Sequence, residues 1–275
     1  MAETIRDRLR SLQPGVSGRT LKQWLEAGRV RVNGTVVRRG DRAVSRADRV
    51  DLGAPPPPPF PAPLRLVHAD EHVYVIDKPP GLLTIANAGE RHRTAYRLLR
   101  DWVEAQNGRR IFVVHRLDRE TSGLLVFARS PEAKEMLQKQ FHHRTPERLY
   151  HARVEGVVRE NEGTLTSRLA EGSSLRIRPT RDTERGREAI TRYRVLERYE
   201  DSTLLELKLV TGRRGQIRAR LAALGHPILG DREYGSRRDP FKRVCLHATR
   251  LGFMHPEGRR VTYQSRAPAV FRRAT

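Results

Sequence analysis

The segment HRLDRETSGLLVFA, residues 115–128, brings several chemically capable side chains together. His115, Arg116 and Asp118 stand between two apolar runs, IFVV and LLVFA, which are typical of buried strands. A polar loop between buried strands is a common position for catalytic residues. An ionised Asp118 could act there as a nucleophile or as a proton acceptor. Asp, Thr, Ser and Gly also form ordinary turns, so this segment alone leaves a purely structural interpretation open.

Three further segments place candidate residues beside predicted strands. A Pro-Pro-Gly turn follows Lys78 in IDKPPGLLT, and Tyr150 lies within the alternating run ERLYHARVEG. Residues 213–224 predict a helix with Ile217 on its buried face. Arg218 then points about 100° away, towards a possible cleft. Each residue also has a plain structural interpretation: Tyr150 as a half-buried strand aromatic, and Arg218 as a solvated helix charge.

The helices and strands that we expect around these residues indicate an α+β fold. Helices are expected at 94–106 and from Ser130-Pro131 to about Phe141, in addition to 213–224. Strands outnumber helices and do not alternate with them, which excludes a doubly wound nucleotide fold. The sequence also lacks GxGxxG and GxxxxGK[ST]. The expected strands are 72–77, 124–128, 148–156, 189–199 and 203–210, with two more within 244–253 and 259–265.

Residues 53–63, GAPPPPPFPAP, predict a stiff polyproline linker between a small unit (1–52) and a large one (64–275). A ligand for an aromatic-lined domain is the alternative for such a tract. In the small unit, Ser17 can cap a helix that runs to about Ala27, and Asn33-Gly34 is a strong hairpin signal. Basic residues at this junction could bind a phosphate backbone; they are Arg19, Lys22, Arg29 and Arg31.

The charge of the chain favours a polyanionic partner. Its 54 Lys and Arg residues against 32 Asp and Glu residues give a net charge of +22 over 275 residues. Only six of the basic residues are lysine, and arginine suits bidentate phosphate contacts. A general preference for Arg codons explains that ratio equally well, but it does not explain the net charge. Nucleic acid is favoured over an anionic membrane surface, because no basic amphipathic helix of membrane type is present.

The motifs together resemble two known families. The run from Ser17-Gly18-Arg19 to Val32-Asn33-Gly34 is similar to the S4-like RNA-binding domain, over most of residues 5–52. HRLD followed by TSGLL, together with the other three segments in this order, resembles the RluA-like pseudouridine synthases over essentially all of 64–275. The resemblance implies a catalytic domain on a curved, mainly antiparallel mixed sheet with flanking helices, preceded by a small α/β RNA-binding domain.

The resemblance also implies residue roles. Asp118 matches the catalytic aspartate, Arg218 the basic residue that pairs with it, and Tyr150 the tyrosine that stacks on an extruded uracil and offers its hydroxyl for proton transfer. Arg116 matches the residue that enters the space left by the extruded base. Other predicted RNA contacts are His115 (more as a support of the loop), Ile217 as an apolar wall, Arg213 and Gln216, besides Arg19, Lys22, Arg29 and Arg31 in the small unit.

One departure concerns the turn TGRRGQ, where Gly215 replaces the usual histidine. A glycine in the first turn of a helix would destabilise that helix by roughly 1 kcal/mol. The change also puts the RNA contacts of residues 213–216 in doubt. It does not touch Asp118, Tyr150 or Arg218, so we do not infer a loss of activity.

The predicted function is isomerisation of uridine to pseudouridine in structured RNA, ribosomal rather than transfer RNA, by a cytoplasmic monomer without cofactor or metal. The first residues, MAETIRDRLR, have no signal-peptide core, and no apolar run could span a membrane. The single Cys245 excludes an intramolecular disulfide and a cysteine-cluster metal site. The alternatives are a non-catalytic RNA-binding or ribosome-assembly factor that retains the fold and, more weakly, a nucleic-acid glycosidase.

Overall fold

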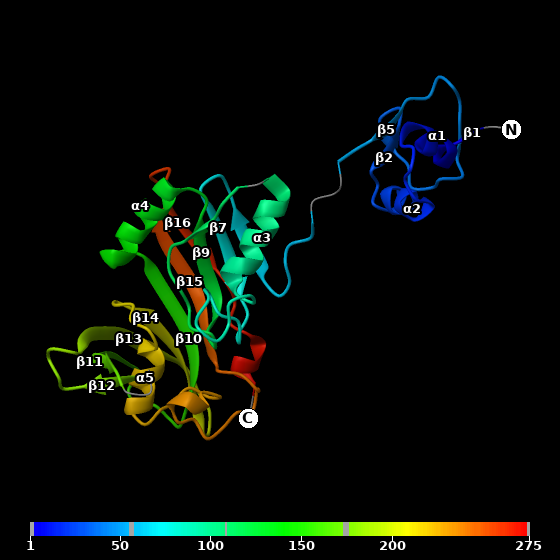
Figure 1. The fold of residues 1–275 in the computed structure, drawn as a ribbon. Helices are drawn as coiled ribbons and strands as arrows, with labels where there is room; N and C mark the ends of the chain where they lie inside the picture. Colours follow the sequence, from blue (N-terminus) through cyan, green and yellow to red (C-terminus); the bar gives the residue numbers. More distant parts are fainter. Residues whose placement is uncertain (1–2, 55–57, 108, 173–175, 274–275) are drawn as a thin grey trace. The chain divides into compact units, whose positions relative to one another are not determined.

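The computed structural model describes residues 3–54, 58–107, 109–172 and 176–273, and it divides the chain into two compact units (Figure 1). Unit 1 is Met1–Pro59 and unit 2 is Phe60–Thr275. Pro55–Pro57 of the predicted linker lie outside the described residues. Phe60 packs edge-on against Trp102 with ring centroids 4.9 Å apart, so unit 2 begins a few residues before the predicted start. In the described part of the chain, no helix has the length and apolar content that crossing a membrane requires.

Unit 1 is built around a small apolar core that includes Ile5, Leu9, Leu21 and Leu25. Ser17 caps α2 by accepting a hydrogen bond from the Thr20 amide, as predicted. The Asn33-Gly34 turn joins an antiparallel pair of strands, which confirms the predicted hairpin. A first helix was missed because its short run is mostly charged. The elements are β1 (Glu3–Thr4), α1 (Ile5–Leu12), α2 (Gly18–Glu26), β2 (Val30–Val32), β3 (Thr35–Val36), β4 (Ala43–Val44) and β5 (Val50–Leu52).

Unit 2 is one large sheet with helices against it, an α+β arrangement as predicted. Its strands are β6 (Arg65–Ala69), β7 (Val73–Lys78), β8 (Phe112–Val113), β9 (Ser122–Ala128), β10 (Glu147–Glu155), β11 (Glu162–Glu171), β12 (Ile177–Thr180), β13 (Arg187–Arg198), β14 (Ser202–Leu209), β15 (Leu246–Met254) and β16 (Arg260–Gln264). Its helices are α3 (Ala95–Asn107), α4 (Pro131–His142) and α5 (Gln216–Ala223), with short 3₁₀ turns η1 (Arg232–Tyr234) and η2 (Ala269–Arg272).

The strands β7 and β9 are buried on both faces, which explains their almost continuous apolar sequences. Tyr74 and Ile76 face the core beneath α3, whereas Val73 and Val75 face the core beneath α4. The two helices therefore cover opposite faces of this part of the sheet (Figure 1). Packing of helices on both faces fixes the position of β9, the strand that immediately follows the Asp118 loop.

The sheet has the order β12-β11-β13-β14-β10-β15-β9-β7-β6, with β16 paired to β15 and β8 to β9. Every pairing is antiparallel except that of β15 with β9, which joins two antiparallel halves through only two residue pairs. One of them places Gly123 opposite Ala248. Gly123 has a φ of +110°, and a β-carbon there would lie 2.3 Å from the Ala248 carbonyl oxygen. Glycine is therefore required at this close approach.

A buried polar chain reinforces the same junction. His247 is 3 % exposed, and its two ring nitrogens lie 2.8 Å from Ser122 Oγ and 3.1 Å from Ser265 Oγ. Ser265 in turn donates to Asp77 on β7, and Arg243 donates to Ser122. Because buried polar groups are costly unless they are hydrogen-bonded, this chain holds β9, β15 and β7 in one register.

Two local predictions are corrected by the structure. The third helix of unit 2 begins at Gln216 rather than at Arg213, because the preceding residues form a turn. Gly215 is the N-cap with a φ of +59° and not a helical residue, so the predicted helix penalty is wrong and glycine is favourable there. The strands β11 and β12 were also missed, since most of their side chains are polar and only some are buried.

The neutral state of His247 predicts a loss of stability in acid. Burial lowers its pKa to about 4 from an ordinary value of 6.5. Above pH 6.5 neither the folded nor the unfolded form is protonated, and the full stability is present. As the pH falls from 6.5 to 4, only the unfolded form gains a proton, so the free energy of unfolding decreases by up to about 3 kcal/mol.

Urea unfolding followed by circular dichroism between pH 7.5 and 4 should show this decrease, and His247→Gln should flatten part of it. His115, which is also held neutral, accounts for a further share. His92→Gln is the matched control, because His92 is exposed and should leave the profile unchanged. A His247→Gln profile identical to that of the wild type contradicts the assignment.

Candidate active site

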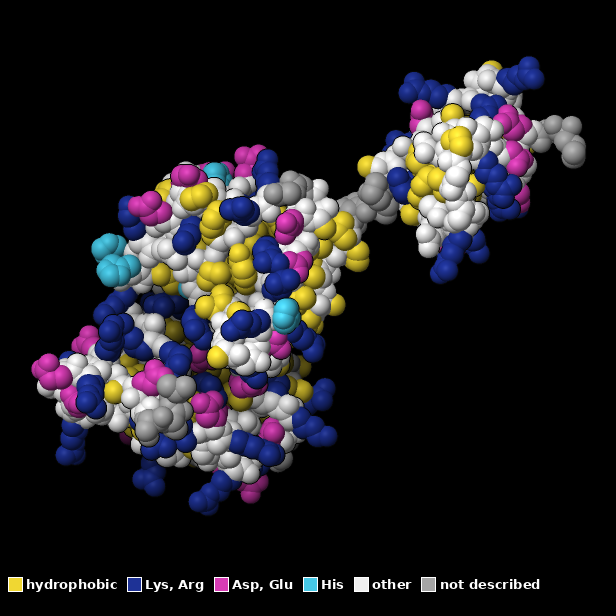
Figure 2. Space-filling view, in the orientation of Figure 1, with side chains coloured by type: hydrophobic (Ala, Val, Ile, Leu, Met, Phe, Trp, Pro, Cys, Tyr) yellow, Lys and Arg dark blue, Asp and Glu magenta, His cyan; other side chains and the backbone are white. Residues whose placement is uncertain are grey.

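A cavity of about 510 Å³ opens in unit 2 and brings together all the site residues predicted for this unit. Lys and Arg side chains gather around a hollow between α4 and the β11–β14 part of the sheet (Figure 2). Of the charged side chains that line the cavity in the described part of the chain, six are arginines and one is a carboxylate, Asp118. The predicted residues that line it are His115, Arg116, Asp118, Tyr150, Arg213, Gln216, Ile217 and Arg218.

Asp118 lies on the loop between β8 and β9, opposite the start of α5. Its carbonyl accepts a hydrogen bond from the Thr121 amide, which closes the turn, and its Oδ2 accepts one from the Gly215 amide at 3.2 Å. Gly215 is the N-cap of α5, so the carboxylate lies at the positive end of that helix. The arrangement favours an anion at this point and links the two halves of the sheet directly through the site.

Lys78 anchors the Asp118 loop from beneath. Its side chain is fully buried, and Nζ donates to the carbonyls of Pro79, Leu82 and Arg119. Thr84 adds two further bonds, to the amide and the carbonyl of Leu117. These contacts tie residues 78–84 to the Asp118 loop.

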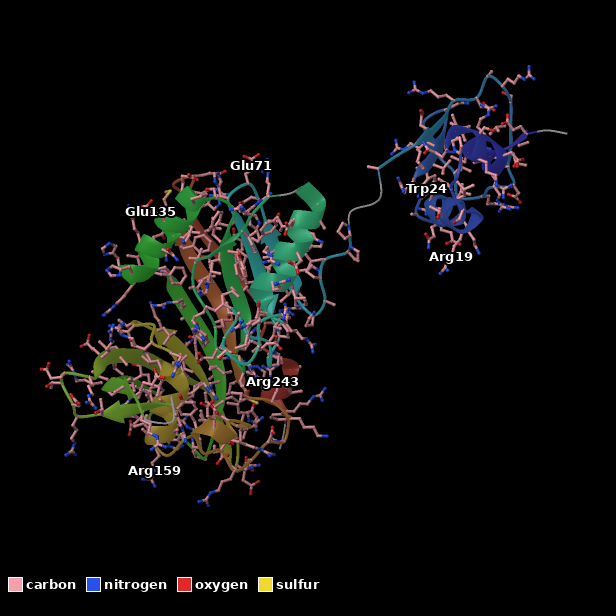
Figure 3. The ribbon with its side chains drawn as sticks, in the orientation of Figure 1. Arg19, Trp24, Glu71, Glu135, Arg159 and Arg243 are labelled. Carbon is pink, nitrogen blue, oxygen red and sulfur yellow. The ribbon has the colours of Figure 1, made fainter. Side chains whose placement is uncertain are left out.

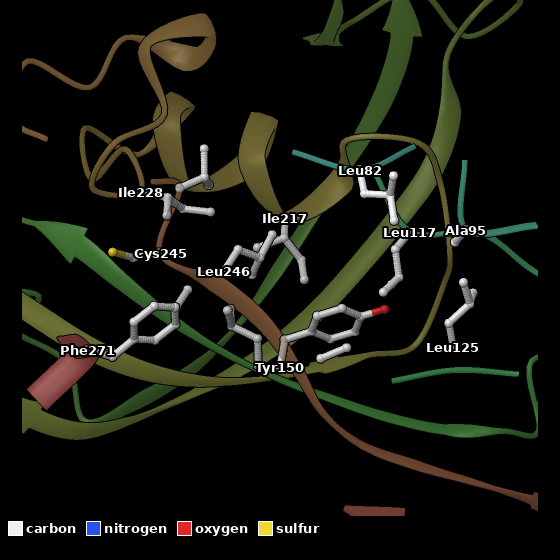
Figure 4. Close-up of a cluster of buried hydrophobic side chains, with 14 of the residues drawn as sticks. Leu82, Ala95, Leu117, Leu125, Tyr150, Ile217, Ile228, Cys245, Leu246 and Phe271 are labelled. Atoms are coloured by element: carbon white, nitrogen blue, oxygen red, sulfur yellow. The ribbon is translucent and has the colours of Figure 1, made fainter. Parts of the chain in front are cut away.

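Tyr150 projects from β10 into the cavity. Its ring lies among Ile217, Leu246 and Leu117, with the hydroxyl directed towards the Leu117 side (Figure 4). The side chain is 7 % exposed, and burial raises its pKa to about 12, so the hydroxyl keeps its proton at neutral pH. The phenol makes no hydrogen bond within the described part of the chain, which leaves its hydroxyl for a bound molecule.

Arg218 is fixed by a different partner from the one expected. Its Nε and Nη2 donate to the two carboxylate oxygens of Asp231, both at 2.7 Å, and Nη2 also reaches Glu233 at 2.9 Å. Burial alone would lower the pKa of Arg218, but Asp231 outweighs that effect and raises it. Within the described residues Arg218 forms no ion pair with Asp118, so the predicted direct pairing is wrong. Asp231 holds the Nε and Nη2 donors of Arg218, and the negative charge of Asp118 interacts with the guanidinium without a direct ion pair.

His115 supports the loop rather than presenting a charge. Its Nε2 accepts a hydrogen bond from the Val126 amide of β9, and its ring stacks on Phe141 with centroids 4.4 Å apart. Burial, assisted by Arg148, lowers its pKa to about 3. The imidazole is therefore neutral at physiological pH and helps to hold the loop against β9.

The side chains of the remaining predicted cavity residues differ in how many of their polar groups are already bonded within the protein. Gln216 is saturated inside the protein: its amide bonds Ile190, Thr191, Thr211 and the Arg213 backbone, so it holds the turn. Within the described residues the Arg213 side chain donates only to the Glu188 carbonyl, at 3.3 Å, and Ile217 is a buried wall. Arg116 is exposed at the cavity and forms no ion pair within the described part of the chain.

In unit 1 the predicted basic residues are mostly exposed, with Arg19 projecting from α2 (Figure 3). Lys22 lies one turn further along α2 and 3.8 Å from Glu26, and Arg31 is exposed on β2. Arg29 is partly used, because its guanidinium lies over the Trp24 ring and donates to the Gly53 carbonyl. Among the described residues of both units, no three His, Cys, Asp or Glu side chains converge in a way that could hold a metal ion.

The cavity suits a polyanionic substrate, because an arginine-rich lining surrounds one carboxylate and one buried phenol among the described residues. The comparison with known proteins specifies the class. The chain belongs to the RNA pseudouridylate synthase family, whose profile matches residues 72–223, and it is an isomerase that converts uridine to pseudouridine in RNA.

Relatives cover most of the chain. It is 34 % identical to an uncharacterized RNA pseudouridine synthase of Aquifex aeolicus, over 94 % of this chain and 88 % of the relative. It is 38 % identical to the ribosomal large subunit pseudouridine synthase D of Xylella fastidiosa, over 90 % of this chain and 80 % of the relative. The dual-specificity RNA pseudouridine synthase RluA of Escherichia coli is 38 % identical over 79 % of this chain and 97 % of the relative.

The solved structure of human RNA pseudouridylate synthase domain containing 4 has the same fold. It superposes with a TM-score of 0.64 over 75 % of this chain and 90 % of its own, at 23 % identity. The expected curved, mainly antiparallel mixed sheet with flanking helices is thereby confirmed.

One residue that shapes the site was not predicted to do so. Asp231 received no role from the sequence, yet it orients Arg218. An acidic residue 13 positions after a helical arginine gives no signal in the sequence, because the contact depends on how the 225–230 loop folds back.

Asp231 and Glu233 offer a matched pair of substitutions. Asp231→Asn should lower the free energy of unfolding by about 3–5 kcal/mol, because it leaves the buried Arg218 guanidinium without its bidentate carboxylate. Glu233→Gln should change it by less than about 1 kcal/mol, since the Glu233 side chain is 55 % exposed. Urea unfolding at pH 7 measures both. Equal effects of the two substitutions would show that Asp231 does not determine the position of Arg218.

Proposed function

We propose that unit 2 isomerises uridines of ribosomal RNA at this cavity, with Asp118 as the reacting carboxylate. The observation that supports the proposal most directly is that Asp118, Tyr150 and Arg218, which come from three distant segments, line a single cavity. Asp118 is the one carboxylate among the described lining residues, and its Oδ2 accepts a hydrogen bond from the Gly215 amide at the N-terminus of α5. Three intact groups at one point speak against a non-catalytic RNA-binding factor that merely retains the fold.

The geometry supports a role for each group. A stacked uridine must be extruded to reach the cavity, and the exposed Arg116 can enter the space it leaves. The uracil then stacks on the Tyr150 ring against Ile217. The N1–C1′ bond breaks, the base turns, C5 bonds to C1′, and the proton on C5 moves to N1 through the site. Asp118 either attacks as the nucleophile or accepts a proton, and Tyr150 offers a protonated hydroxyl for the transfer.

The share of this chain that each relative matches favours ribosomal RNA over transfer RNA as the substrate. Unit 2 spans residues 60–275, less than four-fifths of the chain, so a match over 90 % of the chain must include part of unit 1. Such long matches occur with proteins named ribosomal large subunit pseudouridine synthase D, whereas the matches to proteins named dual-specificity RluA cover 74–79 %. Unit 1 is therefore a feature shared with the proteins named for ribosomal RNA.

Unit 1 then serves as an S4-like RNA-binding module, with residues 53–63 as a spacer. Its short helix and hairpin place Arg19 and Lys22 on α2 and Arg31 on β2, all exposed, with Arg29 between them. We expect the enzyme to act as a cytoplasmic monomer, because one cavity suffices for each modified uridine.

Tritium release tests the catalytic assignment. Ribosomal RNA labelled with tritium at uracil C5 and prepared without the modification should lose tritium to water when incubated with the wild-type protein. Asp118→Asn should lower the rate roughly 10⁴-fold or more, because it removes the reacting carboxylate. Asp101→Asn, a change of the same kind on the exposed face of α3, should leave the rate unchanged.

Chromatography of the digested product distinguishes the alternatives. Pseudouridine is the expected product, whereas free uracil would identify a glycosidase. Release by both the wild type and Asp118→Asn, or by neither on all cellular RNA, contradicts the catalytic assignment.

Removal of residues 1–59 tests the role of unit 1. The remaining chain, 60–275, should fold, retain the maximal rate of tritium release and bind ribosomal RNA at least about tenfold more weakly, since several phosphate contacts are lost. Arg19→Gln with Arg31→Gln in the full chain should weaken binding in the same direction. The control pair is Arg39→Gln with Arg49→Gln, because those residues are ion-paired with Asp41 and Asp51. Unchanged affinity after the deletion would rule out an RNA-binding role for unit 1.

A further inference from the structure

Three arginines are buried among the described residues, and one of them lacks the partners that the other two have. Arg153 is fully buried and donates to Ser202 Oγ and to carbonyls near the C-terminus, and Arg218 is bound by Asp231. Arg148 is 7 % exposed, yet its Nε and Nη2 are buried without a hydrogen bond to any described residue. It also forms no ion pair with a described residue. A buried cation without hydrogen bonds is costly, so Arg148 calls for a functional explanation.

Arg148 is held in this state by apolar and glycine contacts. Its guanidinium carbon lies 5.8 Å from the centre of the Phe141 ring, whose other neighbour in the stack is His115. On another side, a β-carbon on Gly212 would lie 2.4 Å from Nη1 of Arg148, so a side chain there would displace the guanidinium. Phe141 and Gly212 line the same cavity as Arg148. The protein therefore positions this cation without neutralising it.

The charges around Arg148 increase its need for an anion. Burial lowers its pKa, and Arg144 adds to that effect. Arg213 and Arg214 line the same cavity, and the one carboxylate of the lining, Asp118, is bonded to the Gly215 amide. Nε and Nη2 are two unused donors in the geometry that suits a phosphate or carboxylate. Both are buried in the free protein, so an anion that binds them must displace the side chains that cover them.

We propose that Arg148 binds a phosphodiester of the RNA beside the extruded uridine, and so fixes the target nucleotide by its backbone while Tyr150 holds its base. The inference rests on the proposed function for its substrate class. Arg148 and Tyr150 lie two residues apart on β10, roughly 7 Å along the strand, and both line the cavity. That spacing suits a base and a phosphate of the same or the adjacent nucleotide. A uracil carbonyl is the weaker alternative, because it would leave the charge of Arg148 uncompensated.

The proposal predicts opposite effects of one substitution on folding and on binding. Arg148→Met keeps the length and the apolar contacts of the side chain but removes the charge. It should raise the urea midpoint of the free protein, because an unpaired buried cation is removed. It should also weaken RNA binding by about tenfold or more and reduce the salt dependence of binding by about one phosphate contact. A residue with a merely structural role would destabilise the fold and leave the salt dependence unchanged.

Filter binding of a large-subunit ribosomal RNA transcript at 50–300 mM KCl, with every variant in the Asp118→Asn background, measures affinity without turnover. Arg148→Lys should restore part of the affinity and the salt slope. Gly212→Ala keeps the charge but displaces the guanidinium, and it should weaken binding like Arg148→Met. Arg194→Gln is the matched control, since Arg194 is exposed, pairs with Glu206 and does not line the cavity.

An Arg148→Met protein with the parental affinity and salt slope would overturn the proposal. Loss of affinity with an unchanged salt slope would also overturn it and would point to a uracil carbonyl as the partner. Because binding is measured without chemistry, failure of tritium release by the wild type would count against the proposed function alone. The predicted effects of Arg148→Met on affinity and slope would still identify a phosphate site.

Discussion

The two residue pairs that join β9 to β15 are the constraint on which the site depends. Asp118 belongs to the half of the sheet that ends in β9, whereas Tyr150 and Arg218 belong to the half that includes β10 and the helix α5. Two parallel pairs are a short seam for an 11-stranded sheet, and the fold strengthens them locally. Gly123 permits the close approach, and His247 hydrogen-bonds across it to Ser122. A shift of one residue at this seam would move Asp118 relative to Tyr150 by several ångströms.

The arginines of unit 2 show how one residue type serves different purposes according to its partners. Arg218 is held in place by the carboxylate of Asp231. Arg153 is bonded to carbonyls and a serine, and it holds the C-terminal segment. Among the described residues, Arg148 is buried without a partner, whereas Arg116 is exposed and forms no ion pair. The net charge of +22 indicates a polyanionic partner, but only the partners of each guanidinium distinguish structural arginines from those that contact RNA.

Much of the fold could be predicted because the informative patterns are local. Ser130-Pro131 starts a helix, Asn33-Gly34 makes a hairpin, and the continuous apolar runs of β7 and β9 indicate strands buried on both faces. The strands β11 and β12 could not be predicted, because they are half-exposed and their order in the sheet depends on long-range pairing. In the site, the motif selected Asp118, Tyr150 and Arg218. The bond from Lys78 to the Arg119 carbonyl and the pair of Arg218 with Asp231 could not be found, since each contact joins residues that are separated in the sequence.

Gly215 shows how a departure from the family pattern can be compatible with the chemistry. Its backbone conformation, φ +59°, is one that glycine adopts readily, and its amide bonds the Asp118 carboxylate. A β-carbon at this position would lie 2.7 Å from the Tyr234 hydroxyl, and the Tyr234 ring in turn lies 4.6 Å from the Arg218 guanidinium carbon. The absence of a side chain therefore lets α5 start directly against the catalytic loop. The turn has no side chain at this position, but its backbone amide contacts Asp118, the carboxylate that we propose to react.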